Sequence, residues 1–269
     1  MSSSQSHTAH TVGAHGGDRY LVTDTAVDAS RPERPVRVAQ IETDTIALSV
    51  DLNKTAILVI DMQNDFCAEG GWLHSAGCEM HGMREPIEPI NQTTAEMRAT
   101  GQPVIWLNWG NRPDLHNVPA VVQLPFHQLG RGVGLSCPQP NNRYEARARG
   151  SRVLEKDSWG SQVIDELLRE SSDIGVDKYR ISGFCDSQLD SILRKLGIRT
   201  LLFAGVNADQ CVMATLMDAT FLGYDAVLLR DCVATSSPDF CMDATIYNVR
   251  SVFGFVSDSG HVISAIRKA

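Results

Sequence analysis

The sequence predicts an α/β protein in which helices cover both faces of a six-stranded, mainly parallel sheet, giving a three-layer α/β/α fold of the Rossmann-like type. From Lys54 onward, short apolar runs alternate with helical patterns, which is typical of βα units. The run 55–61 is continuously apolar up to its last residue, as expected for a strand buried on both faces. The 269 residues, 43% apolar and 21% charged, suffice for one such domain with extensions.

Each further element has its own justification. Residues 86–99 form a helical pattern closed by Gly101, and the apolar run 103–109 follows as the second strand. Residues 111–150 are rich in Gly and Pro without clear periodicity, so we expect a long excursion of the kind that is often functional. The second half is more regular, with strands expected at 174–179, 200–206, 226–229 and 252–256, separated by helices at 187–196, 211–222 and 238–250 and followed by a last helix.

The chain is predicted to divide into an N-terminal extension, 1–50, that is partly disordered, and a domain over 51–269. The first 19 residues are rich in Ser, His and Gly and lack the apolar core of a signal peptide. A metal-binding tail made by His7, His10 and His15 is an alternative, but this composition is more typical of a disordered extension. No apolar run reaches the ~18 residues of a membrane span, so we expect a soluble, cytoplasmic protein.

Net charge and cysteine content indicate which class of partner and which redox state of the thiols to expect. The net charge of −8 and the absence of a basic run argue against nucleic acid, which favours a small-molecule partner. The seven cysteines include no Cys-x-x-Cys pair, so reduced thiols are expected.

The expected order of the six strands, numbered along the chain, is 3-2-1-4-5-6 with right-handed crossovers. In that order strands one and four are neighbours at the point where the winding reverses, and ligands bind beyond the carboxyl ends of strands at such a point. Asp61 ends the first strand and Cys211 follows the fourth. We therefore expect these two side chains to meet at the carboxyl edge of the sheet.

Cys211 lies at the start of a predicted helix, where unpaired backbone N–H groups and the helix dipole favour negative charge. A thiolate should therefore form more easily there than from an ordinary thiol, whose pKa is about 8.5. The alternative is a buried, inert cysteine of the kind common in cores. Position alone favours the inert interpretation, which we keep for Cys185, Cys232 and Cys241.

Two charged residues are placed to assist such a thiol. Asp61 ends an apolar strand without an apolar reason to be acidic, so it is a candidate to accept the thiol proton and later to activate water. Lys178, near the end of the third strand, would stabilise both the thiolate and the carboxylate. The alternatives are a turn or capping aspartate and a solvated lysine.

Taken together, these residues resemble the isochorismatase-like cysteine hydrolases, whose catalytic triad is Asp, Lys and Cys. Residues 59–66 (Val-Ile-Asp-Met-Gln-Asn-Asp-Phe) are similar to the family's first-strand motif, Lys178 stands at the lysine position, and 205–212 (Gly-Val-Asn-Ala-Asp-Gln-Cys-Val) are similar to the nucleophile motif. The resemblance covers about residues 55–266. Three matches in the right order outweigh the structural alternatives for each residue.

The resemblance implies an amidohydrolase that acts on linear amides. The Cys211 thiolate would attack an amide or ureido carbonyl, Asp61 would take the thiol proton and pass it to departing ammonia, and water would hydrolyse the resulting thioester. A cis peptide bond is implied between Val206 and Asn207, so that the backbone N–H groups of Asn207 and Cys211 form an oxyanion hole.

Within the family, residues 180–184, 189–194 and 253–258 resemble ureidoacrylate amidohydrolases, whereas 85–90, 112–115 and the glycine-rich 130–134 resemble biuret and triuret hydrolases. The implied substrate is a small ureido compound that loses a terminal carbamoyl group. Another small amide, such as an N-carbamoyl amino acid or a lactam, remains an alternative, as does a catalytically silent binding module. Isochorismatase-type vinyl ether hydrolysis is disfavoured by the cysteine.

Several residues are candidates to bind the substrate, although an aromatic near a strand end is often simply core: Phe66, Trp72, Trp109, Asn111 and Asn207. Asn207 stands where the family usually has Thr or Ala, so its amide adds a polar group. Residues 109–114 lack the Asp-x-His metal motif of related nicotinamidases. No metal site and no cofactor are therefore expected, and the resemblance implies a homodimer or homotetramer.

Overall fold

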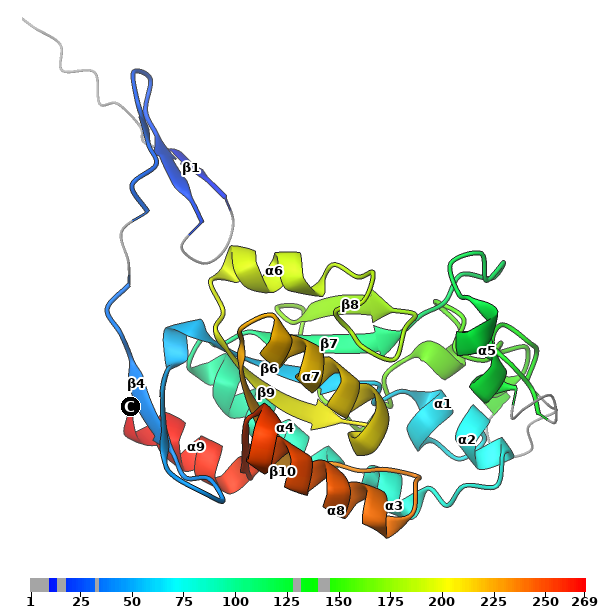
Figure 1. Cartoon of the computed structure of the whole chain (residues 1–269). Coiled ribbons are helices and arrows are strands. Elements are labelled where there is room, and N and C mark those ends of the chain that lie inside the picture. The colour runs from blue at the N-terminus through cyan, green and yellow to red at the C-terminus, as the bar shows by residue number, and fades with distance from the viewer. Residues whose placement is uncertain (1–9, 14–17, 32–33, 128–131, 140–145) are drawn as a thin grey trace, which may run out of the picture.

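The structure, a computed structural model, describes residues 10–13, 18–31, 34–127, 132–139 and 146–269. His7 and His15 of the predicted tail and residues 130–131 of the glycine-rich stretch lie outside these ranges. The centre is a six-stranded sheet in the order β11-β10-β9-β6-β7-β8 (Figure 1). All neighbouring strands of this sheet are parallel, and their bounds are β6 (Thr55–Ile60), β7 (Val104–Trp109), β8 (Ile174–Lys178), β9 (Thr200–Gly205), β10 (Asp225–Val233) and β11 (Phe255–Ser257). The predicted order 3-2-1-4-5-6 is confirmed.

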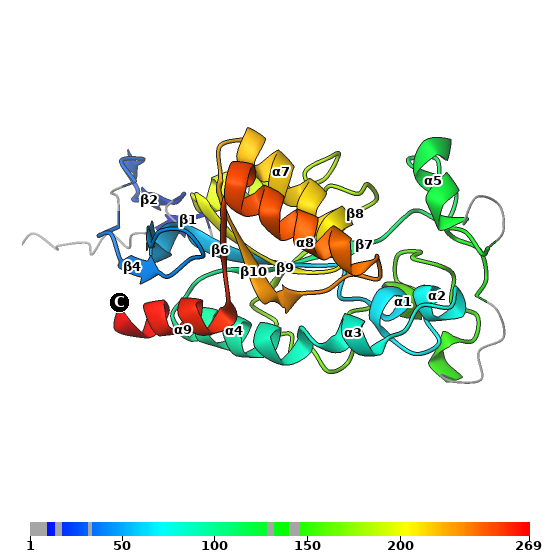
Figure 2. The same cartoon turned by 60° about the horizontal axis from the view of Figure 1, so that its bottom comes forward.

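Helices form a layer on each face of the sheet (Figure 2), which confirms the three-layer prediction. One face carries α4 (Ile87–Ala99) and α9 (Ser259–Lys268), and the other carries α6 (Leu189–Leu196), α7 (Met213–Phe221) and α8 (Asp239–Asn248). Shorter helices lie near the carboxyl end of the strands: α1 (Asn64–Cys67), α2 (Trp72–Ser75), α3 (His81–Arg84) and α5 (Ala120–Phe126). Within the described part of the chain, none of the helices is long and apolar enough to cross a bilayer.

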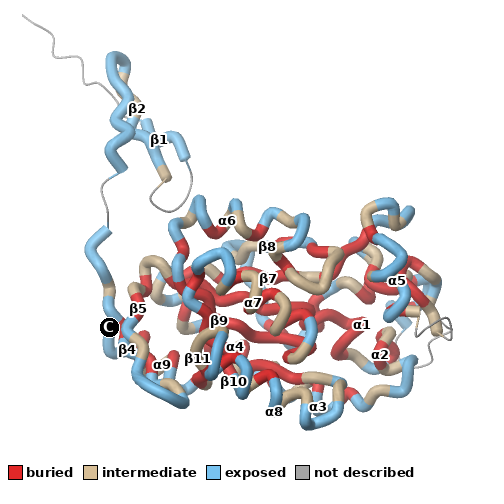
Figure 3. The backbone as a smooth tube through the Cα atoms, viewed as in Figure 1, coloured by how far each residue is buried: buried red, intermediate tan, exposed pale blue. Residues whose placement is uncertain are grey.

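Strand β6 occupies the middle of the molecule because its side chains are apolar on both faces. All six of its residues are buried, and the sheet forms the most deeply buried part of the backbone (Figure 3). Ile57 and Val59 pack in the core beneath α4 and α9, whereas Leu58 and Ile60 pack beneath α6 and α7. The apolar residues of β6 thus contribute to the hydrophobic core on each face of the sheet.

Three predicted boundaries differ from the structure by three residues or more, and the first is that of the strand expected at 226–229, which continues to Val233 as β10. The chain becomes helical at Ala208, three residues before the expected start at Cys211, because a π-helical turn, η5 (Ala208–Val212), precedes α7. The strand expected at 252–256 is displaced to Phe255–Ser257, because a second π-helical turn, η6 (Val249–Phe253), prolongs α8 as far as Gly254.

The hydrophobic core also includes residues that precede Lys54 in the sequence. Strands β4 (Val38–Ile41) and β5 (Leu48–Asp51) pair antiparallel and pack beside α9, with Ala39, Ile41 and Val50 in the core. The alternating exposed and buried pattern of β4 is that of a half-buried strand. N-terminal to this hairpin, β1 (His10–Val12), β2 (Tyr20–Val22) and β3 (Val27–Asp28) form a separate sheet that stands away from the body in Figure 1.

Gly205, the last residue of β9, allows the two central strands to end side by side. Its φ is 108°, in the region that side chains disfavour, and a Cβ there would lie 2.0 Å from the carbonyl oxygen of Ile60. The N–H of Val206 donates to that same oxygen at 2.9 Å. The missing side chain therefore sets the separation between Asp61 and the segment that carries Cys211.

We predict that Gly205→Ala lowers the free energy of unfolding by roughly 2–4 kcal/mol, because the new methyl group must displace backbone. Gly197→Ala is the matched control, since Gly197 also has a positive φ, 71°, but has no atom within 4 Å of a built Cβ. The control should lose only about 1–2 kcal/mol. Chemical denaturation of both variants measures the difference, and equal losses would contradict the close-contact argument.

Candidate active site

Asp61 turns the chain sharply at the end of β6. Its φ of 51° lies in the left-handed region, which is uncommon outside glycine but tolerated by aspartate. Its N–H donates to the carbonyl of Leu107 at 2.9 Å, and its Oδ1 accepts from the N–H of Trp109 at 3.0 Å. Both bonds fix the buried carboxyl group against β7, which leaves Oδ2 to face Lys178.

Lys178 ends β8 with a side chain that is 0% exposed, so the solvated-lysine alternative is wrong. Its Nζ lies 2.7 Å from Asp61 Oδ2 and donates to Cys211 Sγ at 3.4 Å and to the Arg180 carbonyl at 3.2 Å. The ammonium also lies 4.6 Å from the centre of the Trp109 ring. An ammonium group has three N–H donors, and this one has three partners.

Cys211 lies within η5, in the gap between β9 and α7, and is 6% exposed. Its carbonyl accepts from the Thr215 hydroxyl at 2.6 Å, and that hydroxyl accepts from the N–H of Gly183 at 3.0 Å. The turn that holds the thiol is thereby tied to the loop that follows β8. The structure thus brings Asp61, Lys178 and Cys211 together at the carboxyl edge, as the strand order predicted for Asp61 and Cys211 and as the family resemblance implied for Lys178.

Burial raises the pKa of the Cys211 thiol to about 12, although the charge of Lys178 lowers it in part. Burial also raises the pKa of Asp61 against the opposing effect of Lys178. The pKa of Lys178 rises because the Asp61 carboxylate and Cys211 outweigh the effect of burial. At Cys211 burial therefore outweighs the ease of thiolate formation that the helix start led us to expect.

Asn207 precedes η5, and the peptide bond between Val206 and Asn207 is cis, as the family resemblance implied. Its side-chain Oδ1 accepts from the N–H of Ser236 at 3.0 Å, which fixes the amide against the loop after β10. Among the described residues, no acceptor takes the backbone N–H of Asn207. This donor, four residues before Cys211 in the sequence, is therefore available to another group.

Aromatic rings from distant segments cluster at this edge. Trp109 and Phe126 have ring centroids 4.7 Å apart, Phe126 and Trp72 5.3 Å, and Trp72 and Phe66 6.3 Å. Trp72 also donates from its indole nitrogen to the carbonyl of Val133 at 2.8 Å. Sequence reasoning missed Phe126, which lies in the long excursion, where no periodicity distinguishes a buried ring from an exposed one.

The predicted pair Trp109 and Asn111 is fully buried and internally bonded. The Trp109 indole donates to Asn111 Oδ1 at 3.1 Å, and Asn111 Nδ2 contacts the Ser136 hydroxyl at 2.6 Å. Gln63, another residue that sequence reasoning missed, accepts from the Trp109 N–H at 2.8 Å and donates to the Trp109 carbonyl at 2.7 Å. Its sequence signals were its place directly after β6 and its membership of the motif at residues 59–66.

Asp65, in the same stretch, organises the loops around the site. Its carboxylate accepts from the N–H groups of Trp72 at 3.1 Å and Leu154 at 2.7 Å, and from the Gln139 amide. Burial raises its pKa to about 6, against the effect of these hydrogen bonds. One side chain thus connects α2 with the segments that contain Gln139 and Leu154.

The other cysteines divide by burial. Cys232 is buried, and burial raises its pKa well above the ordinary value, in line with an inert core residue. Cys185 is exposed and Cys241 is only half-buried, so the core interpretation is wrong for these two. Cys185 follows β8 in a loop, where its side chain has no core to enter.

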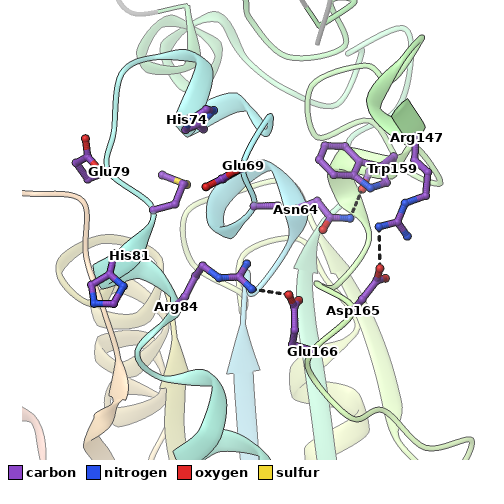
Figure 4. Close-up of a pocket in the computed structure, with 12 residues that line it drawn as sticks. Asn64, Glu69, His74, Glu79, His81, Arg84, Arg147, Trp159, Asp165 and Glu166 are labelled. Atoms are coloured by element: carbon purple, nitrogen blue, oxygen red, sulfur yellow. Dashed lines mark hydrogen bonds and ion pairs between the residues drawn. The ribbon is translucent and has the colours of Figure 1, made fainter. Parts of the chain in front are cut away.

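A separate cavity of about 570 Å³ lies between the α1–α3 region and residues 147–166 (Figure 4). Its walls are polar and carry two ion pairs, Arg84 with Glu166 at 2.5 Å and Arg147 with Asp165 at 2.8 Å. None of Asp61, Lys178 and Cys211 lines it. In the described part of the chain, no group of three or more His, Cys, Asp or Glu is arranged to hold a metal ion.

Comparison with known proteins places the chain in a family. The model of the isochorismatase domain matches residues 55–260. A cysteine hydrolase from Pseudomonas syringae pv. phaseolicola 1448A is 22% identical, with 88% of this chain and 99% of that chain covered and a TM-score of 0.67, and shows the fold alone. Pyrazinamidase of Pyrococcus horikoshii, in complex with zinc, is 22% identical, covers 76% and 99%, and has a TM-score of 0.57.

N-carbamoylsarcosine amidase from Thermoplasma acidophilum is 27% identical, with 77% of this chain and 96% of that chain covered and a TM-score of 0.56. Because the family model spans well over half of the sequence, this chain belongs to the isochorismatase family.

Proposed function

We propose that the protein is a cysteine-dependent amidohydrolase that cleaves a terminal carbamoyl C–N bond of a small ureido compound and releases ammonia. The observation that carries this proposal is the contact of one buried ammonium, Lys178 Nζ, with both Asp61 Oδ2 at 2.7 Å and Cys211 Sγ at 3.4 Å. A nucleophile, a base and a cation in mutual contact are the parts that thiol-based acyl transfer requires.

The protonation of the site supports a role for Asp61 as the base. A thiol whose pKa is raised to about 12 is a weak nucleophile at neutral pH and needs a local proton acceptor. The raised pKa of Asp61 makes its carboxylate a better acceptor than an ordinary aspartate. Lys178 keeps its charge throughout and offsets the negative charge that moves from Asp61 to sulfur.

The proposed reaction has two halves. The Cys211 proton moves to Asp61, sulfur bonds to the ureido carbon, and the C–N bond breaks as Asp61 returns the proton to the leaving nitrogen, which departs as ammonia. Water then attacks the thioester while Asp61 accepts a proton from it and passes that proton to the departing sulfur. The product is a carbamic acid, which loses carbon dioxide in solution, and each proton taken up by Asp61 is returned.

The oxyanion of each tetrahedral intermediate is proposed to lie against the backbone N–H groups of Asn207 and Cys211. The available N–H of Asn207 supports this, and the bond from Ser236 holds the Asn207 amide in place. Removing a single donor of this kind typically costs about 3–4 kcal/mol of barrier.

The ureido substrate is inferred from two observations. The sequence resembles ureidoacrylate, biuret and triuret hydrolases in several segments. The 27% identical relative is an amidase for N-carbamoylsarcosine, which also carries a terminal carbamoyl group. Phe66, Trp72, Trp109, Asn111 and Asn207 remain the candidates for substrate contact, and Phe126 joins them because its ring packs on Trp109 and Trp72.

We predict ammonia release from one or more of biuret, triuret, ureidoacrylate and N-carbamoylsarcosine. Cys211→Ser should lower kcat/KM by at least about 10³-fold because the nucleophile is lost. Asp61→Asn should lower it by roughly 10²–10⁴-fold because the base is lost. Cys241→Ser, at a half-buried thiol outside the site, is the matched control and should keep full activity. Absence of ammonia from every amide tested would refute the proposal. Full activity of the Cys211→Ser variant would show that Cys211 is not the nucleophile.

A second prediction concerns the resting thiol. Alkylation of Cys211 by iodoacetamide, followed on its own peptide by mass spectrometry, should accelerate with rising pH and reach no plateau near neutrality, because its pKa is raised to about 12. Lys178→Met removes the cation that lowers this pKa, so alkylation at a given pH should slow further. A plateau already present at pH 7 would show a preformed thiolate and remove the need for Asp61 as base.

A further inference from the structure

The side chain of Asn207 is held in one orientation by the loop that follows β10. Its Oδ1 accepts from the N–H of Ser236 at 3.0 Å and from the Ser236 hydroxyl at 3.4 Å. An amide group is planar, and its oxygen and nitrogen point in different directions. The bonds from Ser236 therefore direct the other end of the amide, Nδ2, away from this loop.

Further hydrogen bonds fasten the segment 207–210 to the loop 234–237. They run from the N–H of Ala208 to the carbonyl of Ala234, from the Thr235 hydroxyl to Asp209, and from the Gln210 amide to the Ser237 hydroxyl. Backbone and side chains thus hold the two segments together along their whole length. The Asn207 amide is attached to a fixed support, which keeps its orientation the same with and without a ligand.

The nitrogen of this amide is a donor without an acceptor. Asn207 is only 7% exposed, and among the residues that the structure describes no acceptor takes an N–H of Nδ2. Nδ2 is nevertheless not among the fully enclosed side-chain atoms that lack a partner, so water or a ligand can reach it. Its backbone N–H is likewise available, so a single residue offers two donors to a ligand.

Asn207 lies one helical turn before the proposed nucleophile. Its carbonyl accepts from the N–H of Val212, the residue after Cys211, at 3.1 Å. Residues four positions apart on a helix are neighbours on one face, so Asn207 and Cys211 are adjacent on η5. A ligand whose carbonyl carbon is attacked by Cys211 therefore passes close to the donors of Asn207.

We propose that Asn207 selects an acylurea, in which the urea nitrogen carries a second carbonyl group, as in biuret. This inference rests on the proposed amidohydrolase function. The backbone N–H of Asn207 binds the oxygen of the attacked carbonyl, and Nδ2 binds the oxygen of the second carbonyl. The chain of covalent bonds from the backbone nitrogen of an asparagine to Nδ2 is as long as that between the two carbonyl oxygens of an acylurea. Two donors on one residue thus match two acceptors on one ligand.

The charges around the thiol also favour a neutral acceptor. The Lys178 ammonium is already paired with the Asp61 carboxylate at 2.7 Å. The Arg180 guanidinium donates to the carbonyl of Asn117 at 2.5 Å and lies 3.9 Å from the Asp186 carboxylate. A ureido acid such as ureidoacrylate brings a carboxylate, which binds best to a cation with its charge free. The second carbonyl of an acylurea is neutral and is satisfied by a neutral amide.

Steady-state kinetics on biuret and methylurea test the inference, because methylurea has the terminal carbamoyl group but no second carbonyl. We expect wild type to prefer biuret and Asn207→Ala to reduce that preference roughly tenfold, since one hydrogen bond to the substrate is lost. The preference is the ratio of kcat/KM values for ammonia release. If methylurea binds without being hydrolysed, its inhibition constant against biuret gives the comparison.

Asn207→Asp separates recognition from positioning. This variant keeps an oxygen that accepts from the N–H of Ser236 and loses only the donor, so the loop stays attached. We expect its kcat/KM for biuret to fall at least about tenfold all the same. Gln210→Ala is the matched control, because it removes an exposed amide that bonds to the same loop. It should leave the preference for biuret unchanged.

The possible failures of the inference and of the proposed function differ. Ammonia released from ureidoacrylate or N-carbamoylsarcosine but not from biuret would overturn the choice of an acylurea and leave the amidohydrolase in place. Equal losses on biuret and methylurea in Asn207→Ala, or full biuret activity of Asn207→Asp, would show that Asn207 only positions the loop. Absence of ammonia from every amide tested would remove the proposed function, and the inference with it.

Discussion

A fully buried ammonium group must find partners for all three of its N–H donors, and Lys178 finds them in Asp61, Cys211 and the Arg180 carbonyl. The desolvation of such a charge costs several kcal/mol, which only close and well-oriented partners offset. The backbone follows this requirement, since Asp61 takes a left-handed conformation that turns its carboxyl group toward the ammonium. β6, β8 and the segment after β9 are thereby tied to a single point.

The loops around this point are held by a second set of buried polar groups. Gln63 pairs its side-chain amide with the backbone of Trp109, and Asp65 accepts hydrogen bonds from segments far apart in the sequence. Both residues come from the stretch that follows β6, so the strand that supplies the proposed base also orders the surrounding excursion. The ring of Phe126 packs on Trp72 and Trp109, whose backbone groups are held by Asp65 and Gln63. The same buried polar groups therefore position both the loops and the aromatic cluster.

The sequence by itself determined the strands of the sheet and their alternation with helices, because both are local patterns. The meeting of Asp61 with Cys211 followed from the strand order that is common in such folds, which the structure confirms. Only the tertiary structure decided the direction in which the pKa of Cys211 shifts, since that pKa depends on burial by residues distant in the chain. The placement of Phe126 and the attachment of the β4–β5 hairpin are decided in the same way. Each depends on which distant segments pack or pair together, and local sequence patterns do not determine this.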